Sequence, residues 1–295
     1  MRSRLVLLGG GNALGRAVMR LGAEDDISFV SPRPDGHTWD VQGLADVLQQ
    51  VKPDVVINLA YYYDWFQAGA IDPAVFPEQE NVVTALAKLC AQHNCALLQP
   101  SSYRVFDGSR TTAYTEEDEC RPLSERGKAL LRMEQSVREH SAKHLILRFG
   151  WLLDDSHSSL LGRVLQRAQE HIALELADDR RGNPTPVEDA ARVILAMLKQ
   201  LDCGAQLWGT YHYGAQEAAT SLSVGQAILA EAKYWVPSIE QAVDARGHAS
   251  FGDAIIEPQH GVLDCRKITH TFGIKPRSWR ASMSDLLHSY YRNAN

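Results

Sequence analysis

The sequence predicts an α/β fold, a Rossmann-type doubly wound parallel sheet with a small C-terminal lobe. Short apolar runs typical of buried parallel strands alternate with helix-favouring segments through the first half of the chain. A glycine cluster at residues 9–15 joins the first apolar run to the first helical segment. Beyond residue 150 the alternation becomes irregular. We therefore expect a Rossmann domain at residues 1–150, and at residues 151–295 a small lobe that completes the same fold and binds substrate.

The elements follow from runs of apolar residues and from the breaks between them. Strands are expected at residues 5–8, 27–30, 53–60, 96–102, 145–149 and 209–213. Helices are expected directly after the glycine cluster and at residues 43–51, 78–93, 125–141, 160–170, 186–199, 223–233 and 279–292. Residues 237–261 show no clear pattern.

The glycine cluster predicts a binding site for the pyrophosphate of a dinucleotide. Gly9, Gly11 and Gly15 stand where a tight turn requires residues without a Cβ, and Asn12 is expected to tolerate left-handed backbone angles. The helix that follows, starting near Ala13 and Leu14, points its positive dipole end at the anion. A plain strand-to-helix turn without a ligand is the alternative interpretation.

Further residues are predicted to bind the rest of this cofactor. The second strand ends without an acidic residue to hold an adenosine 2′-hydroxyl, and Arg33 suits a 2′-phosphate, so NADP is slightly favoured over NAD. An exposed loop arginine is the alternative reading of Arg33. Four more candidates stand before the second helix or after the third strand: Asp40, Leu59, Ala60 and Tyr61. The aromatic run at residues 61–65 either stacks on the nicotinamide and closes the site, or packs in the core.

Composition limits the classes of partner. The net charge of -6 provides no basic surface for nucleic acid. No apolar run reaches membrane-spanning length, and Met1 to Arg4 lead into a strand rather than a cleavable signal, so a cytoplasmic protein is expected. The five cysteines are odd in number and lack metal-ligand spacing, and the eleven histidines form no His-Glu-x-x-His motif. We expect reduced thiols and no metal.

Several segments in order along nearly the whole chain carry one resemblance. They are Pro-Asp-Val-Val-Ile-Asn-Leu-Ala (53–60), Pro-Ser-Ser-Tyr-Arg-Val-Phe-Asp-Gly (100–108), Arg-Gly-Asn-Pro-Thr-Pro-Val-Glu-Asp (181–189), Gly-Thr-Tyr-His (209–212) and the run from Thr271 to Arg280. They resemble the RmlD-like (dTDP-4-dehydrorhamnose reductase) family of short-chain dehydrogenases/reductases. The resemblance implies an NAD(P)-binding fold and reduction of a nucleotide-linked 4-keto sugar.

The resemblance weakens at the reacting groups. The family's Tyr-x-x-x-Lys follows a Tyr-x-Glu-x-Asp segment and a proline, which residues 114–118 and Pro122 match. The same spacing puts Arg126 at the tyrosine position and Leu130 at the lysine position. An arginine, with a pKa above about 12, is expected to keep its proton and to be a poor general acid. Such proton transfer contributes roughly 10²–10⁴-fold in rate.

Three residues are the catalytic candidates: Ser102, Tyr103 and Arg126. Ser102 is expected to hydrogen-bond a substrate oxygen, and Tyr103 is the alternative proton donor. Arg180 stands where the family has glutamine, and Glu257 stands where it has arginine, where it would repel a diphosphate. Four arginines are candidates to face a small anionic ligand, or else are separately solvated or salt-bridged: Arg104, Arg126, Arg180 and Arg181.

Two functions are consistent with these residues. The first is a non-catalytic or regulatory protein that lacks the Tyr-x-x-x-Lys pair, binds a dinucleotide together with a sugar nucleotide or other small anion, and serves a protein partner. The alternative is an active NADPH-dependent nucleotide-sugar 4-keto reductase with a different proton donor. We prefer the first on the sequence alone, because the tyrosine and lysine are replaced while the surrounding frame is intact.

Overall fold

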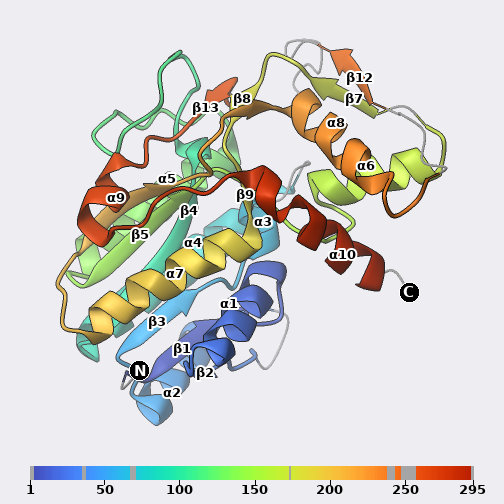
Figure 1. Ribbon diagram of the computed structural model, residues 1–295. Helices are drawn as coiled ribbons and strands as arrows, with labels where there is room; N and C mark the ends of the chain where they lie inside the picture. The colour runs from blue at the N-terminus through green and yellow to red at the C-terminus, as the bar shows by residue number, and fades with distance from the viewer. Residues whose placement is uncertain are drawn as a thin grey trace.

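The computed structural model describes residues 3–34, 38–66, 71–172, 174–237, 243–246 and 257–293, and it is built on a six-stranded sheet (Figure 1). Across this sheet the strands run β10 (Gly209–Tyr213), β5 (His144–Phe149), β4 (Ala96–Ser102), β3 (Val55–Asn58), β1 (Leu5–Leu8) and β2 (Phe29–Val30). All neighbouring strands are parallel. The predicted fold class is confirmed.

The sheet has a switch point at β1. The chain passes from β1 to β2 on one side and then returns to β3 on the other, so a crevice opens at the carboxyl ends of β1 and β3. Every residue of β1 and β3 is buried, as expected for parallel strands covered on both faces. Both β2 and β3 are shorter than predicted, because pairing covers only Phe29–Val30 and Val55–Asn58.

Helices cover both faces of the sheet (Figure 1). On one face α1 (Ala13–Glu24) packs against α7 (Val187–Asp202). On the other face lie α2 (Val41–Val51), α4 (Phe76–Gln92) and α5 (Glu125–His140). The starts of α1, α2 and α5 are set by local sequence, since Asn12, Asp40 and Ser124 each accept the backbone N–H of the residue three positions on.

The chain leaves the sheet after β5 to build a lobe beside it. Elements of the lobe are β6 (Trp151–Leu153), α6 (Leu160–Gln169), β7 (Leu174–Ala177), β8 (Arg181–Gly182), β9 (Pro184–Pro186), β11 (Ala219–Thr220), α8 (Ser221–Ala232), β12 (Val243–Arg246), β13 (His260–Gly261), η4 (Trp279–Ser282) and α10 (Met283–Asn293). A second apolar cluster joins α6, α8 and α10. Between these segments, α7 and β10 return to the sheet, so the division at residue 150 stays a prediction.

The remaining elements surround the crevice or close the sheet. They are α3 (Tyr62–Phe66), η1 (Pro73–Val75), η2 (Tyr103–Val105) and α9 (Arg266–Phe272). The helix predicted at residues 279–292 is divided into η4 and α10. Much of residues 237–261 lies outside the described residues. Within the described ranges, no helix has both the length and the apolar character that crossing a membrane requires.

Candidate functional site

The glycine turn joins the end of β1 to α1 and touches the end of β3. Gly9 has φ +83°, and a Cβ there would lie 2.3 Å from the carbonyl oxygen of Leu59. A Cβ on Gly15 would lie 2.3 Å from the carbonyl oxygen of Gly9. Both positions therefore require glycine. A Cβ on Gly11 would meet no protein atom within 4 Å, so the fold itself does not require glycine there; that a bound pyrophosphate requires it stays a prediction.

Asn12 is accommodated for a different reason from the one predicted. Its φ of -82° is extended rather than left-handed. The side-chain oxygen accepts the N–H of Gly15 at 2.9 Å, and the amide nitrogen donates to the carbonyl of Leu59 at 2.7 Å. Asn12 thus caps α1 and ties it to the end of β3. The N–H groups of Ala13 and Leu14 belong to the first turn, where no carbonyl of the helix accepts them, so the turn fits a pyrophosphate.

The segment after β2 lies against this turn. A Cβ on Gly10 would come within 2.2 Å of the Ser31 hydroxyl oxygen, and that hydroxyl donates to the carbonyl of Leu7 at 2.9 Å. Arg33, two residues further on, is exposed, and its preference for a 2′-phosphate stays a prediction. The Asp40 carboxylate accepts the N–H of Gly43 at 2.7 Å. Asp40 therefore caps the N-terminus of α2.

Three predicted cofactor residues directly follow the carboxyl end of β3. Leu59 and Tyr61 are buried and Ala60 is half-buried. Burial raises the pKa of Tyr61 to about 12.

The rest of the aromatic run belongs mainly to the core. The Tyr62 hydroxyl donates to Asp154 at 2.7 Å, and the Trp65 indole N–H donates to Gln79 at 2.8 Å. Both side chains are fully buried, whereas Tyr63 is 42% exposed. Packing in the core is therefore the correct interpretation for Tyr62 and Trp65.

At the end of β4, polar side chains form a buried cluster around Glu257. The Tyr103 hydroxyl donates to Oε2 of Glu257 at 2.6 Å, and Nε of Arg104 donates to Oε1 at 2.7 Å. Nη1 of Arg104 also donates to the carbonyl of Trp65 at 3.1 Å. The Glu257 carboxylate is directed at Arg104 and Tyr103, so its charge is paired within the protein, and repulsion of a diphosphate stays a prediction. Against the effect of burial, the charges of Arg104 and Arg180 and the hydrogen bond from Tyr103 hold its pKa below the ordinary value.

The catalytic candidates Ser102 and Tyr103 both form hydrogen bonds within this cluster. Ser102 is fully buried, and its hydroxyl oxygen accepts the N–H of Arg104 at 3.4 Å, which caps η2. Burial and the carboxylate of Glu257 raise the pKa of Tyr103 well above its usual range. A tyrosine proton held by a carboxylate is poorly placed for transfer to substrate. Tyr103 is therefore a weaker candidate for a proton donor than the sequence indicates.

Arg126 lies beside this cluster in the first turn of α5. A Cβ on Gly127 would lie 2.3 Å from the carbonyl oxygen of Arg104, so α5 begins in close contact with η2. Arg126 is 8% exposed and Leu130 is 1% exposed. Burial and the positive charge of Arg104 lower the pKa of Arg126 to about 10. With this pKa Arg126 still keeps its proton at neutral pH, and the expectation that it is a poor general acid stays a prediction.

Three of the four predicted arginines converge. Arg104, Arg126 and Arg180 all act electrostatically on Glu257, whereas the Arg181 side chain is exposed. The Arg180 guanidinium lies 4.9 Å from the centre of the Trp151 ring.

Sequence reasoning missed Arg163 of α6. Arg163 and Arg180 both line a cavity of about 50 Å³ together with Trp151. The apolar residues of α6 indicate only which face enters the core, so no local signal identifies Arg163.

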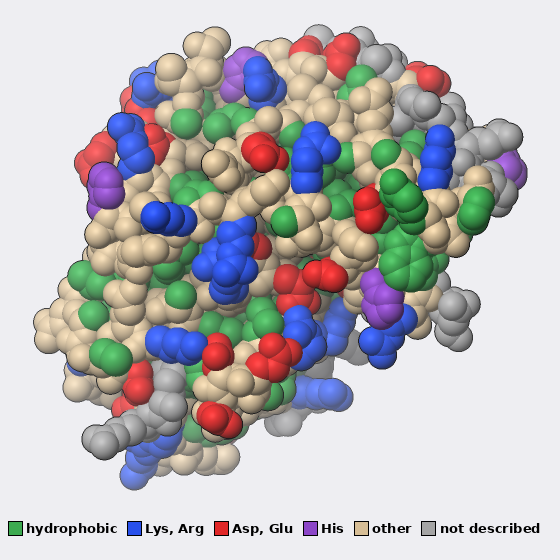
Figure 2. Space-filling model, in the orientation of Figure 1, with side chains coloured by type: hydrophobic (Ala, Val, Ile, Leu, Met, Phe, Trp, Pro, Cys, Tyr) green, Lys and Arg blue, Asp and Glu red, His purple; other side chains and the backbone are tan. Residues whose placement is uncertain are grey.

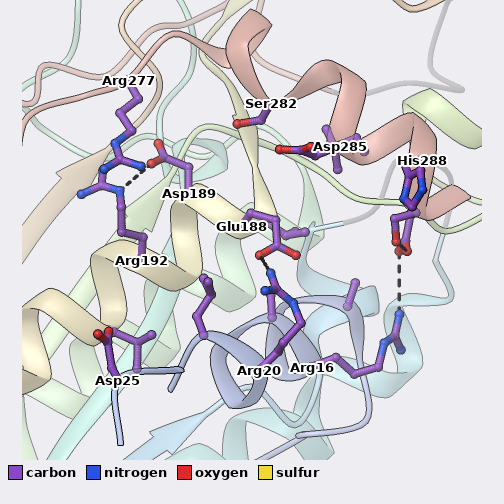
Figure 3. Close-up of a pocket in the computed structure, with 18 of the residues that line it drawn as sticks. Arg16, Arg20, Asp25, Glu188, Asp189, Arg192, Arg277, Ser282, Asp285 and His288 are labelled. Carbon is purple, nitrogen blue, oxygen red and sulfur yellow. Dashed lines mark hydrogen bonds and ion pairs between the residues drawn. The ribbon is translucent and has the colours of Figure 1, made fainter. Parts of the chain in front are cut away.

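A cavity of about 910 Å³ lies elsewhere, between α1, α7 and α10 (Figure 3). Within it Arg20 pairs with Glu188, and Nε of Arg192 lies 2.8 Å from Asp189. Figure 2 shows acidic and basic side chains interspersed over this face rather than a surface of one sign. Most of its lining comes from the sides of α1 and α7, away from the strand ends where ligands bind in such sheets. We therefore place the candidate active site in the crevice. In the part of the chain that the structure describes, no group of three or more metal-ligating side chains is placed to hold an ion.

Comparison with known proteins agrees with this architecture. The model of the family described as "RmlD substrate binding domain" matches residues 3–292. The dTDP-4-dehydrorhamnose reductase of Aggregatibacter actinomycetemcomitans is 27% identical over 289 residues, which cover 96% of this chain and 98% of that protein.

Two solved structures share the fold. The dTDP-4-dehydrorhamnose reductase of Bacillus anthracis, in complex with NADP, has a TM-score of 0.81 at 18% identity and covers 98% of this chain and 100% of that one. The Bordetella bronchiseptica enzyme WbmG, in complex with NAD and UDP, has a TM-score of 0.77 at 15% identity and covers 99% and 96%. Because the family model matches nearly the whole length of this chain, the chain belongs to the RmlD substrate-binding-domain family.

Proposed function

We propose that this chain is an NADP(H)-dependent reductase of a nucleotide-linked keto sugar. The observation that carries the proposal is that the carboxyl ends of β1, β3 and β4 lie side by side along one edge of the sheet. The glycine turn contacts the end of β3 at Leu59, and the end of β4 contacts the start of α5 through Arg104 and Gly127. Because β1, β3 and β4 are neighbours in the sheet, a dinucleotide on the turn and a substrate beside Arg126 lie along the same edge. The names of the relatives supply the substrate class.

Arg126 takes the role of the missing tyrosine in this proposal. When the dinucleotide is bound, its reduced nicotinamide supplies a hydride to the carbonyl carbon. Arg126 donates a hydrogen bond to the carbonyl oxygen as negative charge grows there, and a buried guanidinium stabilises that charge better than an exposed one. Burial and Arg104 favour loss of its proton. Arg126 then gives this proton to the oxygen and recovers one from solvent.

The neighbouring side chains position Arg126 and hold the cofactor. Glu257 and Tyr103 fix Arg104, whose backbone contacts the start of α5 at Gly127. Ser102 supports the same turn through its bond to the N–H of Arg104. Arg33 favours NADP over NAD through a 2′-phosphate.

The test is NADPH oxidation with dTDP-4-dehydrorhamnose, in the wild type and in Arg126→Gln. We expect the substitution to lower kcat by roughly 10²–10⁴-fold while NADPH affinity is unchanged. The exposed Arg181→Gln is the matched control and should keep the wild-type rate. The wild-type rate should be level at neutral pH and fall as the pH approaches the value of about 10 for the Arg126 pKa. Equal rates for Arg126→Gln and the wild type would contradict the role given to Arg126.

A second candidate is a non-catalytic dinucleotide- and sugar-nucleotide-binding protein that serves a protein partner. Two observations favour it: Leu130 is fully packed where the family has a lysine, and the Tyr103 proton is held by Glu257. Following nicotinamide fluorescence while titrating NADPH and NADH is the first measurement. If the wild type binds NADPH but oxidises none of it with any keto-sugar nucleotide, and Arg126→Tyr with Leu130→Lys creates turnover, this second function replaces the first.

A further inference from the structure

Two arginines of the lobe lack a counter-charge of their own. Among the described residues, none forms a hydrogen bond or ion pair with the side chain of Arg163 or of Arg180, and Nε of each is buried without a partner. Each side chain is only half-buried overall, and each carries a charge that persists in proteins. Burial and the positive charge of Arg180 both lower the pKa of Arg163, so the two guanidinium groups repel each other. An anion between the two groups would relieve this repulsion.

The carboxylates nearby are already engaged. Glu257 acts on Arg180 electrostatically, but its two oxygens accept hydrogen bonds from Arg104 and Tyr103. Asp154 lines the same cavity as the two arginines, and its carboxylate accepts the Tyr62 hydroxyl at 2.7 Å and the N–H of Ser156 at 2.9 Å. Neither carboxylate forms an ion pair with Arg163 or Arg180.

The cavity between the arginines suits a small group. Its volume is about 50 Å³, several times the roughly 10–15 Å³ that a single water needs on the same measure, so a carboxylate or phosphate group fits. Trp151 forms one wall, and its ring lies 4.9 Å from the Arg180 guanidinium, a cation–π contact that holds this side chain in place.

We infer that Arg163 and Arg180 form an oxyanion subsite, which binds one phosphate or carboxylate group of the ligand in the cavity beside Trp151. Guanidinium groups bind such oxyanions through two parallel hydrogen bonds, which also orient the ligand. The inference rests on the proposed function for the ligand as a whole, because the oxyanion is either a phosphate of the nucleotide or a carboxylate on the sugar. It differs from the role of Arg126, which acts on the reacting oxygen.

The test is calorimetric titration of the full chain with four probes: inorganic pyrophosphate, dTDP, UDP-glucose and UDP-glucuronate. The variants are Arg163→Gln and Arg180→Gln, with Arg181→Gln as the control because it is exposed on the neighbouring position of β8. Loss of one charge-assisted contact should weaken binding of the relevant probe by about tenfold or more. Arg163→Lys should recover part of the lost affinity, since lysine keeps the positive charge but cannot form the two parallel hydrogen bonds of a guanidinium.

Comparing the four probes shows whether the bound oxyanion is a nucleotide phosphate or a sugar carboxylate. If the subsite binds a nucleotide phosphate, dTDP, pyrophosphate and UDP-glucose all lose affinity in both variants. If it binds a sugar carboxylate, only UDP-glucuronate does. The inference is overturned if no probe binds the wild type, if both variants bind every probe as the wild type does, or if Arg181→Gln causes the same loss.

The outcome is separable from the proposed function. NADPH binding, measured by fluorescence, should be unchanged in both variants, because the glycine turn does not touch the cavity. Thermal unfolding should show no loss of stability, since each substitution removes one of two charges that repel each other. Absence of NADPH-dependent turnover, together with oxyanion binding that depends on Arg163 and Arg180, would refute the reductase and support the subsite. Turnover together with unchanged oxyanion affinity would do the reverse.

Discussion

The glycine turn and the arginine cluster (Arg104, Arg126, Arg163 and Arg180) lie in one protein but depend on different interactions. The turn is made by backbone atoms of residues close in sequence, and Asn12 within it caps α1. The cluster is made by side-chain charges that come from η2, α5, α6 and the segment before β8. Binding of a dinucleotide can therefore persist while the chemistry next to it changes.

The largest expected effect comes from breaking the buried pair inside the cluster. The side chains of Arg104 and Glu257 are 6% and 11% exposed, so Arg104→Leu leaves a carboxylate buried without its partner. We expect urea unfolding to show a loss of about 3–5 kcal/mol, most of it recovered in Arg104→Leu with Glu257→Leu. The exposed pair of Arg132 and Glu80 is the control, since Arg132→Leu should cost at most about 1 kcal/mol. Similar losses in both single variants would mean that burial of the Arg104 pair contributes little.

The next effect tests the backbone of the turn. In Gly15→Ala the new Cβ meets the Gly9 carbonyl oxygen, so the turn must shift, and we expect about 1–3 kcal/mol of destabilisation together with weaker NADPH binding. Gly11→Ala is the matched control: its Cβ enters open space, and its stability should stay within about 0.5 kcal/mol of the wild type. Unfolding curves and fluorescence titrations of the two variants measure both effects. If the two glycines respond alike, the close contact at Gly15 is not what requires glycine.

The third prediction concerns His212, a buried side chain whose positively charged form is disfavoured in the folded protein. Burial and then Arg148 lower the pKa of His212 to about 3, whereas an unfolded histidine titrates near about 6.5. Between these values the unfolded chain binds more protons, so stability falls as the pH falls, by up to about 1.4 kcal/mol per pH unit. His212→Asn should flatten this dependence between pH 4 and 6, measured by urea unfolding. The exposed His270→Asn should leave the slope as in the wild type, and an unchanged slope in His212→Asn would refute the assignment.

The smallest effect separates capping from ligand binding at one residue of the turn. Asn12→Ala removes the cap of α1 and should cost about 1 kcal/mol. Asn12→Asp keeps an oxygen for the N–H of Gly15, but its second oxygen faces the Leu59 carbonyl and its negative charge stands at the start of α1, so stability should fall and NADPH affinity should fall by more. Thermal unfolding and fluorescence titration of the two variants provide the comparison. An Asp variant that binds NADPH as tightly as the wild type would place the pyrophosphate elsewhere.

Most of the fold could be predicted because it depends on local patterns. The apolar runs that form β1, β3 and β4 are short and unbroken, and the polar caps at Asn12 and Asp40 mark where helices start. The turn lies where it was predicted, but the physical reasons given for two of its residues differ from those that the structure shows. Asn12 was expected to be accommodated by its tolerance of left-handed angles, but its backbone is extended, and the protein leaves open space for a Cβ at Gly11.

The site was only half predictable, because its charges interact across long sequence separations. Arg104 pairs with a carboxylate 153 residues away, so the sequence alone does not show whether Glu257 repels a ligand or neutralises an arginine. Arg163 shows no pattern on α6 that distinguishes it from a solvated arginine, and it gains significance only where the lobe places it beside Arg180.

The sequence by itself therefore determined the sheet, the order of its helices and the position of the cofactor turn, because backbone hydrogen bonds and apolar periodicity act between near neighbours. Only the tertiary structure decided which arginines are paired and which are not, and how far the pKa of Arg126 departs from that of an exposed arginine. The physical reason is that the energy of a charge depends on its burial and on every other charge nearby. Those distances exist only once β4, α5 and the lobe are packed together.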